Sequence, residues 1–446
     1  MSLSHILRIL TASALLAMLL VLPARAQTIL RDPDIEHALK QLAAPVLRAA
    51  GLGTAGMRIL VIDDGSLNAF VIDRNHIFLN SGLIQRMETP DMLQSVIAHE
   101  AAHITNGHLT RRPINLRNAR TAAGIGSALA AIAAIAAGGG GEAASAAALG
   151  AQNTAQRLFF VHTRAEENAA DQSGLRYLVD AGISTDGALK VLDLFRGQEL
   201  LSRRRQDPYA RTHPLSQDRY RTVQRLSQAY SGRDTPKDTA AWYWFMRAKG
   251  KLSAFQRSPK WTLNRAGESG YADIKAMREA VAWHRRSNLK RALPLIDKAI
   301  AANPNDPYYY ELKGQILMES RQFDAAASAY GRAAKLAPRN ALIQGSFGRA
   351  LLATGQTKKA LQLLEKSRAS DGRDPRLLRD MATAYAKLGN AGMASVVTAE
   401  RYAMVNRLED AAIHATRATG LLPQGSAGYR RAQDILSAAK RAARNK

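Results

Sequence analysis

The chain of 446 residues contains no cysteine, and its acidic residues are scarce. The lack of cysteine excludes disulfide bonds, a lipid-modified N-terminal cysteine and catalysis by a thiolate. No G-x-S-x-G segment occurs, so the hydrolases that depend on that serine motif are excluded as well. Against 37 Asp and Glu stand 62 Lys and Arg, which gives a formal net charge of +25. Any catalysis must therefore use other groups, and negatively charged partners are favoured.

Residues 99–103 have the sequence H-E-A-A-H, and the pattern H-E-x-x-H on a helix is typical of zinc peptidases. The preceding residues 89–91, Thr-Pro-Asp, supply an N-cap candidate, a proline for the first helical position and a first-turn acid. Residues four apart lie nearly above one another on a helix, so the rings of His99 and His103 can reach one ion. Glu100 then lies beside a water on that ion, as the candidate general base.

A third ligand is needed, because a catalytic zinc site usually has three protein ligands and one water. Residues 164–171 have the sequence R-A-E-E-N-A-A-D, which we expect to be helical. Glu167 and Asp171 lie four residues apart there, so one carboxylate can bind the metal while the other supports a ligand histidine. Glu166 points about 100° away and is the weaker candidate. The alternative is a solvated acidic helix face.

H-E-x-x-H followed by R-x-x-E-x-x-A-D resembles the HtpX and CAAX-prenyl-protease superfamily of zinc metallopeptidases. This resemblance implies one Zn²⁺ per chain, bound by His99, His103 and Glu167. It also implies that Glu100 is the general base and that Asp171 accepts a hydrogen bond from a ligand histidine.

Three further elements concern the same site. Residues 68–70, Asn-Ala-Phe, resemble an element of that superfamily beside the cleft, the alternative being a buried turn and strand. Residues 212–219, T-H-P-L-S-Q-D-R, resemble a segment of its soluble periplasmic members. We expect His213 to face the metal, either stabilising the oxyanion of the tetrahedral intermediate or filling the open coordination position as a latch. His108 is expected on nearly the opposite helix face from His99, as a structural or exposed residue.

The N-terminus has the features of a secretory signal peptide. Arg8 precedes an apolar run over residues 9–22, and Ala24-Arg25-Ala26 fits a cleavage site. An uncleaved membrane anchor is the alternative, although about 14 apolar residues are short for ~30 Å of hydrocarbon. We therefore expect a periplasmic protein, with a peripheral position at the outer membrane as a further option. Nucleic acid is not an expected partner of an exported chain.

The rest of the chain is long enough for two domains. After the signal peptide over residues 1–26, we assign residues 27–230 to a zincin-like zinc metallopeptidase domain with a small β-sheet. Residues 231–270 are assigned to a linker, and residues 271–440 to an all-α solenoid. The expected fold class is α+β, mainly α. The elements expected in the first domain are a helix over 34–50 and strands near 58–63 and 76–80.

The solenoid is predicted from an internal repeat of 34 residues, the period of tetratricopeptide units. Small residues at equivalent positions let paired helices approach, and stacked pairs bury what one pair cannot. After the fourth alanine, the pattern continues only if its register shifts by 17 residues, which indicates an extra hairpin or a capping variant. The repeating alanines are Ala292, Ala326, Ala360 and Ala394.

Positive charge is concentrated in the repeat half. Residues 241–446 hold 36 Lys and Arg against 16 Asp and Glu. Such a surface would attract acidic polypeptides, an anionic membrane surface or lipopolysaccharide, and salt would weaken the association. The alternative is a solvated surface that serves solubility only.

Residues 119–151 are rich in Ala and Gly and link the two expected ligand helices. Their few large apolar residues lie close to one helical face, so an amphipathic helix is favoured over a membrane span. We expect a mobile lid over the active site, with contact to a membrane surface as the alternative.

The combination of signal peptide, metallopeptidase motifs and repeats is similar to that of BepA-type (beta-barrel assembly-enhancing) periplasmic proteases. The resemblance implies a zinc endopeptidase that uses metal-activated water in outer-membrane protein quality control and assembly. Unfolded or stalled outer-membrane proteins would be its polypeptide substrates, and the repeats would contact the outer-membrane assembly machinery. The alternative is an assembly chaperone or adaptor with latent protease activity. An inactive zinc-bearing structural domain conflicts with the presence of Glu100.

Overall fold

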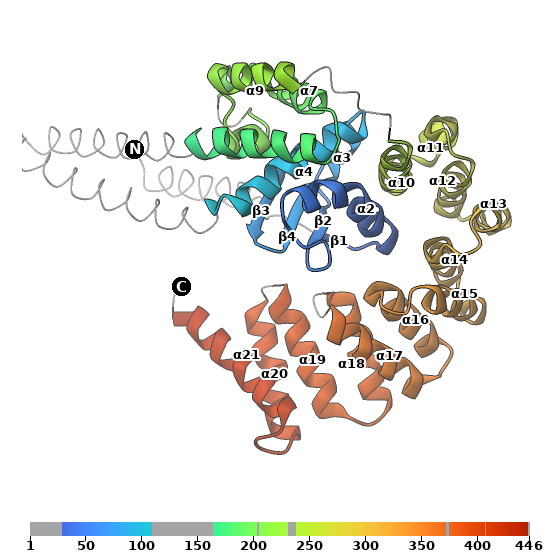
Figure 1. Cartoon of the computed structure of the whole chain (residues 1–446). Helices are drawn as coiled ribbons and strands as arrows, with labels where there is room; N and C mark the ends of the chain where they lie inside the picture. Colours follow the sequence, from blue (N-terminus) through green and yellow to red (C-terminus); the bar gives the residue numbers. More distant parts are fainter. Residues whose placement is uncertain are drawn as a thin grey trace, which may run out of the picture.

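The computed structural model describes most of the chain, which is mainly helical with one four-stranded sheet (Figure 1). The expected fold class, α+β and mainly α, is thereby confirmed. The predicted signal peptide and the Ala/Gly-rich segment lie outside the described residues. None of the described helices combines the length and the apolar character that crossing a membrane requires. The described residues are 29–108, 164–202, 205–230, 238–371, 374–405 and 407–444.

The sheet has the strand order β1-β2-β4-β3. Strands β2 and β4 are parallel, whereas β1 and β3 pair antiparallel with their neighbours, so β3 is an outer strand of the described sheet. The sequence predicts β2 and β4, but it does not predict β1, which has only two residues. The strands span Ile29–Leu30 (β1), Arg58–Ile62 (β2), Ala69–Asp73 (β3) and His76–Asn80 (β4).

Helices α2 (Pro33–Ala49) and α4 (Pro90–Thr105) pack on one face of the sheet. Helix α2 begins where the Asp32 carboxylate accepts two backbone N–H groups, and Pro33 stands at its first position. Helix α4 likewise begins with a proline, as the sequence predicts. Their apolar faces and the inner side chains of β2, β3 and β4 form one core, into which the short helix α3 (Ser81–Arg86) also contributes.

A second helical layer covers α4. It consists of a helix over residues 164–180 together with α7 (Asp186–Phe195), α8 (Pro208–Thr212) and α9 (Gln217–Tyr230). Two glycines allow this layer to approach closely. A Cβ at Gly174 would lie 3.3 Å from the backbone of Ala98 and His99, and one at Gly187 would lie 2.5 Å from the backbone of Asp91. The second layer is therefore held directly against the helix that carries H-E-x-x-H.

Helix α10 (Thr239–Gln256) lies inside the stretch that we assign as a linker. Its Phe245 and Ala248 are buried in the core of the first domain, while Ala254 belongs to the core of the first repeats. Helix α10 thus packs against both α2 and α12. The remaining helices are α11 (Pro259–Arg265), α12 (Ala272–Arg285), α13 (Leu289–Ala302), α14 (Pro307–Glu319), α15 (Phe323–Leu336), α16 (Ala341–Ala353), α17 (Thr357–Ser370), α18 (Pro375–Lys387), α19 (Ala391–Met404), α20 (Leu408–Leu421) and α21 (Ala427–Arg444), with α10 spanning Thr239–Gln256.

The alanines of the 34-residue repeat occupy the fourth position of α13, α15, α17 and α19. The first three have no exposed surface. In α14, Gly314 faces the ring of Tyr330 on α15, and in α16, Gly348 faces Leu364 on α17. The two helices of each pair therefore pack closely at a glycine. Ala411 is the fourth residue of α20, so the alanine pattern moves on by one helix at the end of the array, where α21 packs on both α19 and α20.

The repeat array curves away from α10 and returns beneath the sheet (Figure 1). On its return, Asp371 at the end of α17 accepts hydrogen bonds from Arg31 and Arg58, the latter at 2.7 Å. The side chain of Arg376 also donates to the backbone oxygen of Arg31 at 3.2 Å. The array therefore contacts the first domain both at α10 and at the beginning of α18.

Candidate metal centre

The rings of His99 and His103 lie on one face of α4, and both are buried. Their Nε2 atoms are 3.0 Å apart. The expected i, i+4 geometry therefore places two imidazole nitrogens at a common point. Because this spacing is local to one helix, it follows from the sequence once α4 forms.

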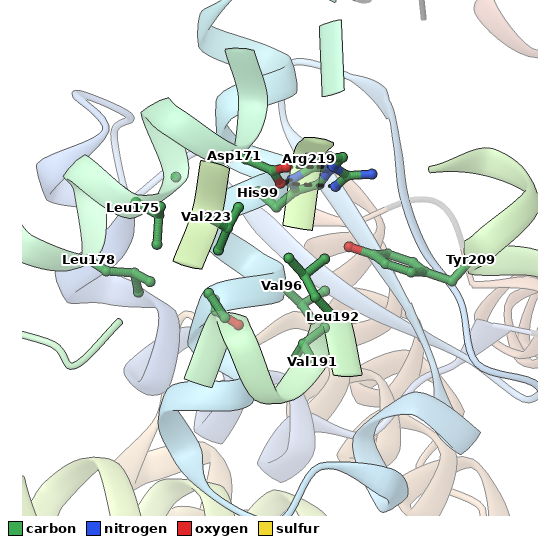
Figure 2. Close-up of a pocket in the computed structure, with 13 residues that line it drawn as sticks. Val96, His99, Asp171, Leu175, Leu178, Val191, Leu192, Tyr209, Arg219 and Val223 are labelled. Carbon is green, nitrogen blue, oxygen red and sulfur yellow. Dashed lines mark hydrogen bonds and ion pairs between the residues drawn. The ribbon is translucent and has the colours of Figure 1, made fainter. Parts of the chain in front are cut away.

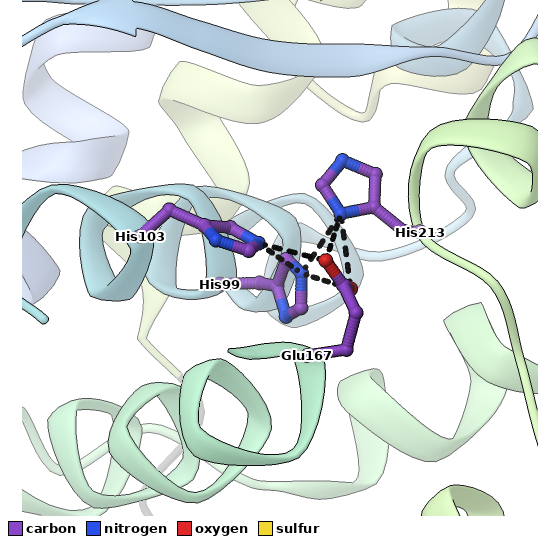
Figure 3. Close-up of side chains that lie close together, drawn as sticks. All are labelled: His99, His103, Glu167 and His213. Carbon is purple, nitrogen blue, oxygen red and sulfur yellow. Dashed lines mark hydrogen bonds and ion pairs between the residues drawn. The ribbon is translucent and has the colours of Figure 1, made fainter. Parts of the chain in front are cut away.

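Glu167 and His213 complete a buried cluster at that point (Figure 3). The Glu167 carboxylate lies 3.2 Å from Nε2 of His99 and 3.3 Å from Nε2 of His103. Nδ1 of His213 lies 3.2 Å from Nε2 of His99 and 3.1 Å from both Glu167 oxygens.

These separations fit a metal ion. Metal–ligand bonds of about 2.0–2.1 Å in a tetrahedron place the ligand atoms about 3.3 Å from one another. The potential ligand atoms of the four residues all lie within 4.8 Å of one another, and three of the residues are the ligands expected from the sequence. Glu166, the weaker candidate, is not part of this cluster. The geometry therefore suits a tetrahedral ion held by imidazole and carboxylate groups.

Asp171 lies behind the cluster rather than in it. Its Oδ1 is 3.0 Å from Nδ1 of His99, the ring nitrogen opposite the one that faces the cluster. Arg219 forms a two-pronged ion pair with the same carboxylate, at 2.5 Å and 2.9 Å. A hydrogen bond of this kind selects the tautomer of a ligand histidine and orients its ring.

The Asp171–Arg219 pair lines a small pocket of about 30 Å³, large enough to hold a water molecule (Figure 2). Residues from five helices form its wall, and the side chains of the ion pair are themselves nearly inaccessible to solvent. The apolar residues of that wall include Val96, Leu175, Leu178, Val191, Leu192 and Val223.

Glu100 has no exposed surface and lies on the other side of the cluster. Its Oε1 is 3.4 Å from Nε2 of His213, which is also 3.4 Å from the backbone oxygen of Ala69 at the start of β3. Asn68 lies close to Thr212, whose hydroxyl is 3.5 Å from the Asn68 side-chain oxygen. The Asn-Ala-Phe and Thr-His-Pro elements therefore meet beside the cluster.

His108 corrects one expectation. We expect it on the opposite helix face from His99, but α4 ends at Thr105, and Gly107 adopts a left-handed conformation with φ of +71°. The chain consequently turns back, and Nδ1 of the buried His108 lies 2.8 Å from Nδ1 of His103. Each H-E-x-x-H histidine thus has a polar partner on its outer nitrogen.

Burial and pairing shift the pKa values of these groups. Burial alone would lower the pKa of His99, but its hydrogen bonds with Asp171 and Glu167 raise it to about 9. Burial lowers the pKa of His103 to about 3. Burial opposes ionisation of Glu167 and Asp171, yet nearby cationic groups, among them Arg219, hold both pKa values below the usual range. Both carboxylates are therefore ionised, as metal binding requires.

Two supporting residues are not evident from the sequence. Arg219 belongs to the quoted segment 212–219, but its spacing gives no hint that it reaches two carboxylates of another helix. Tyr209, buried on α8, packs its ring 4.6 Å from that of His213. Its backbone N–H also donates to the oxygen of Leu67, which joins α8 to the chain ahead of β3.

Comparison with known families and proteins agrees with this geometry. Residues 30–227 match the model of peptidase family M48, and residues 317–382 match a tetratricopeptide-repeat model. The chain is 22% identical over 407 residues to the beta-barrel assembly-enhancing protease of Escherichia coli (strain K12), covering 89% of this chain and 81% of that protein. It is 25% identical over 311 residues to a putative beta-barrel assembly-enhancing protease of Vibrio cholerae serotype O1, covering 64% and 59%.

Two solved structures illustrate the partial similarity to known structures. MamA from Desulfovibrio magneticus RS-1 is 18% identical, with a TM-score of 0.31 and coverage of 38% of this chain and 95% of that one. A thermophilic TPR protein from Thermus thermophilus is 19% identical, with a TM-score of 0.26 and coverage of 37% and 99%. Both similarities are confined to less than half of this chain.

Fold and site together define a metalloprotease joined to an array of helical repeats. Residues 30–227 resemble peptidase family M48, and the residues that match a tetratricopeptide-repeat model follow them in the chain. The resemblance inferred from H-E-x-x-H and R-x-x-E-x-x-A-D is confirmed by these matches.

Proposed function

We propose that this metalloprotease is a periplasmic, zinc-dependent endopeptidase of outer-membrane protein quality control and assembly. One observation carries the catalytic part of the proposal: four potential ligand atoms lie within 4.8 Å of one another, beside a buried glutamate. Imidazole and carboxylate ligands in that geometry suit Zn²⁺.

His99, His103 and Glu167 would hold the ion. Asp171 and His108 would orient the two histidines through their outer nitrogens, at 3.0 Å and 2.8 Å. Bound there, Zn²⁺ would lower the pKa of a coordinated water and polarise the scissile carbonyl.

Glu100 would act as the general base. It takes a proton as water attacks the peptide carbonyl, and it passes that proton to the departing amine. Its position on α4, directly after His99, and its complete burial support this role, because a carboxylate shielded from solvent exchanges protons with its immediate neighbours.

His213 would act as a latch. Its Nδ1 occupies the fourth corner of the cluster, where the water needed for hydrolysis would otherwise bind. His213 would therefore have to swing away before a substrate enters. The oxyanion role that the sequence leaves open is disfavoured by this position, since a stabilising donor must lie beside the reacting carbonyl rather than on the ligand position.

Strand β3 would receive the substrate backbone. Among the described strands it pairs with β4 alone, and its first residue, Ala69, lies beside His213. An extended peptide added to this edge would run past the cluster, with its backbone hydrogen-bonded to the strand.

The cellular role rests on the relatives named beta-barrel assembly-enhancing protease and on the features of the N-terminus. We propose unfolded or stalled outer-membrane proteins as substrates, and outer-membrane assembly machinery as a partner of the repeats. An anionic membrane surface is a further candidate partner, because the repeat half carries most of the positive charge.

The test is metal content combined with degradation of casein by the purified full-length protein. We expect one Zn²⁺ per chain, cleavage that a chelator abolishes, and recovery when zinc is returned. Absence of stoichiometric zinc in active protein would overturn the zinc assignment, and chelator-resistant cleavage would overturn the mechanism.

The position of His213 also favours a second candidate function, that of an assembly chaperone or adaptor with latent proteolysis. A strain that carries Glu100→Gln separates the two functions. Loss of outer-membrane protein quality control in that strain would support the protease, whereas full complementation would make the adaptor role the principal one.

A further inference from the structure

Arg219 is a buried arginine whose side-chain hydrogen bonds and ion pairs, within the described part of the chain, go to the candidate metal centre and the segment beside it. It stands in the first turn of α9, and its side chain is 3% exposed. Nε and Nη2 of the guanidinium donate to the Asp171 carboxylate at 2.5 Å and 2.9 Å. Nη1 lies 3.1 Å from Glu167 and donates to the backbone oxygens of His213 and Pro214, both at 3.2 Å.

These contacts join three separate parts of the site. Glu167 is a proposed metal ligand, Asp171 orients the ligand His99, and the backbone at residues 213 and 214 carries the proposed latch. Without a cation between them, two carboxylates one helical turn apart would repel each other in a site of low polarity. The planar guanidinium has five N–H donors and can hydrogen-bond to Glu167, Asp171 and the backbone oxygens at once, which a lysine ammonium cannot do.

Burial makes the Arg219 ion pairs an inefficient way to stabilise the fold, because moving charged groups out of water costs free energy. Arg219 lines the pocket of Figure 2, as do Val223 of its own helix and Val96 of α4. Replacing a buried ion pair with apolar groups of similar volume is often neutral or stabilising. A purely structural role therefore does not require a guanidinium at this position.

We propose that Arg219 is the positioning residue of the metal centre, which sets the metal affinity through Glu167 and Asp171 and restrains the His213 latch through two backbone oxygens. This inference rests on the proposed zinc peptidase function. According to this proposal, Arg219 couples the metal ligands to the His213 segment, which must move before a substrate can bind.

Arg247 provides a matched control elsewhere in the chain. It is equally buried and also pairs with two carboxylates, Asp34 and Asp306, but at the junction of α2, α10 and α14. Loss of the Arg247 guanidinium should lower folding stability and leave the metal centre unchanged.

The experiment compares Arg219→Lys, Arg219→Met and Arg247→Lys in the full-length protein. Zinc affinity is measured by competition with a chromogenic chelator, and thermal unfolding is measured without metal. We expect Arg219→Met to weaken zinc binding by about 10- to 100-fold, the range found for partners of metal ligands. Arg219→Lys should lose less, and kcat should fall more than KM rises. Arg247→Lys should lower the unfolding temperature and leave zinc affinity within twofold of wild type.

A second arm tests the latch. Arg219→Lys and His213→Ala are combined in a double-mutant cycle on kcat/KM. We expect effects that deviate from additivity by more than threefold, because the lysine can no longer hold the backbone at residues 213 and 214. Additive effects within twofold would overturn the restraint on His213.

The outcomes distinguish this inference from the function on which it rests. If Arg219→Lys and Arg219→Met bind zinc as wild type does while only their unfolding temperatures fall, Arg219 is merely structural. Should Arg219→Met fail to fold, Arg219→Lys alone decides by the same comparison. Wild-type protein that binds no zinc would instead overturn the proposed function itself.

Discussion

Nδ1 of His103 lies 2.8 Å from Nδ1 of His108, and both rings are buried. Two ring nitrogens at this distance share one hydrogen. When Nε2 of His103 faces a metal ion it carries no proton, so Nδ1 of His103 is the donor and His108 the acceptor. His103 is therefore supported by a neutral ring, whereas His99 is supported by the carboxylate of Asp171.

His108→Ala tests this support. Removal of the acceptor leaves the outer nitrogen of His103 without its partner, so zinc affinity should fall by about 10-fold, at the lower end for such partners. The measurement is the zinc dissociation constant. His284→Ala is the matched control, because His284 pairs with Glu319 on the repeats and should leave zinc binding unchanged. Equal affinities of His108→Ala and wild type would contradict the assignment.

Glu167→Gln and Glu166→Gln form a second pair. Glu167 is part of the cluster, whereas Glu166 precedes it by one residue and is not. We expect Glu167→Gln to lose stoichiometric zinc and Glu166→Gln to keep both zinc and casein cleavage. The reverse result would move the third ligand to the neighbouring residue.

Glu100→Gln should separate metal binding from catalysis. The amide cannot accept the proton of the attacking water, so kcat should fall by about 10²- to 10⁴-fold while zinc content stays at one per chain. Substantial residual activity at full zinc occupancy would mean that another group is the base.

His213→Ala should increase the rate of casein cleavage, because it opens the position that Nδ1 of His213 occupies. Zinc stoichiometry should be retained through His99, His103 and Glu167. A strong loss of kcat in the zinc-loaded variant would instead restore the oxyanion role.

The junction between the two domains should weaken as the pH rises. Glu311 lies among the carboxylates of Asp32 and Asp34, with Lys251 as its cationic neighbour at 3.9 Å. Burial, opposed by Lys251, raises the pKa of Glu311 from 4.5 to about 8. Because the folded pKa is raised, the contribution of Glu311 to stability is complete below pH 4.5 and is lost as the pH rises through 8. Thermal unfolding across roughly pH 5 to 9 measures it, and Glu311→Gln should flatten this dependence. An equally steep dependence in the variant would exclude Glu311 as its source.

Replacing either of two glycines with alanine tests how closely the repeat helices pack. A Cβ at Gly314 would lie 2.8 Å from the Tyr330 ring, so Gly314→Ala should destabilise the array by about 1–3 kcal/mol through overpacking. Gly331 is the control, since a Cβ there would lie 3.4 Å from Phe347, an ordinary contact. Gly331→Ala should be neutral or stabilise its helix by up to ~1 kcal/mol. Denaturant unfolding of both variants checks the opposite signs.

Local spacing explains which parts of the site could be predicted. The pairs His99/His103 and Glu167/Asp171 are each four residues apart on one helix, so their shared faces follow from helical geometry. The position of His108 could not be read in this way, because it depends on where α4 ends and on the left-handed turn at Gly107. Arg219 was missed since its partners, Glu167 and Asp171, lie about fifty residues earlier in the chain, a separation that no periodicity encodes.

What the amino-acid sequence determined by itself is the local chemistry: one helix with two imidazoles and a glutamate, a second with two carboxylates, and a 34-residue repeat of small residues. Tertiary structure decided how these parts meet. Only tertiary packing brings Glu167 of the 164–180 helix and His213 at the end of α8 to His99, and only the curvature of the array brings Asp371 to Arg31. The physical reason is that hydrogen bonds and helical faces are set by neighbours in sequence, whereas contacts between distant segments depend on how whole apolar surfaces are buried.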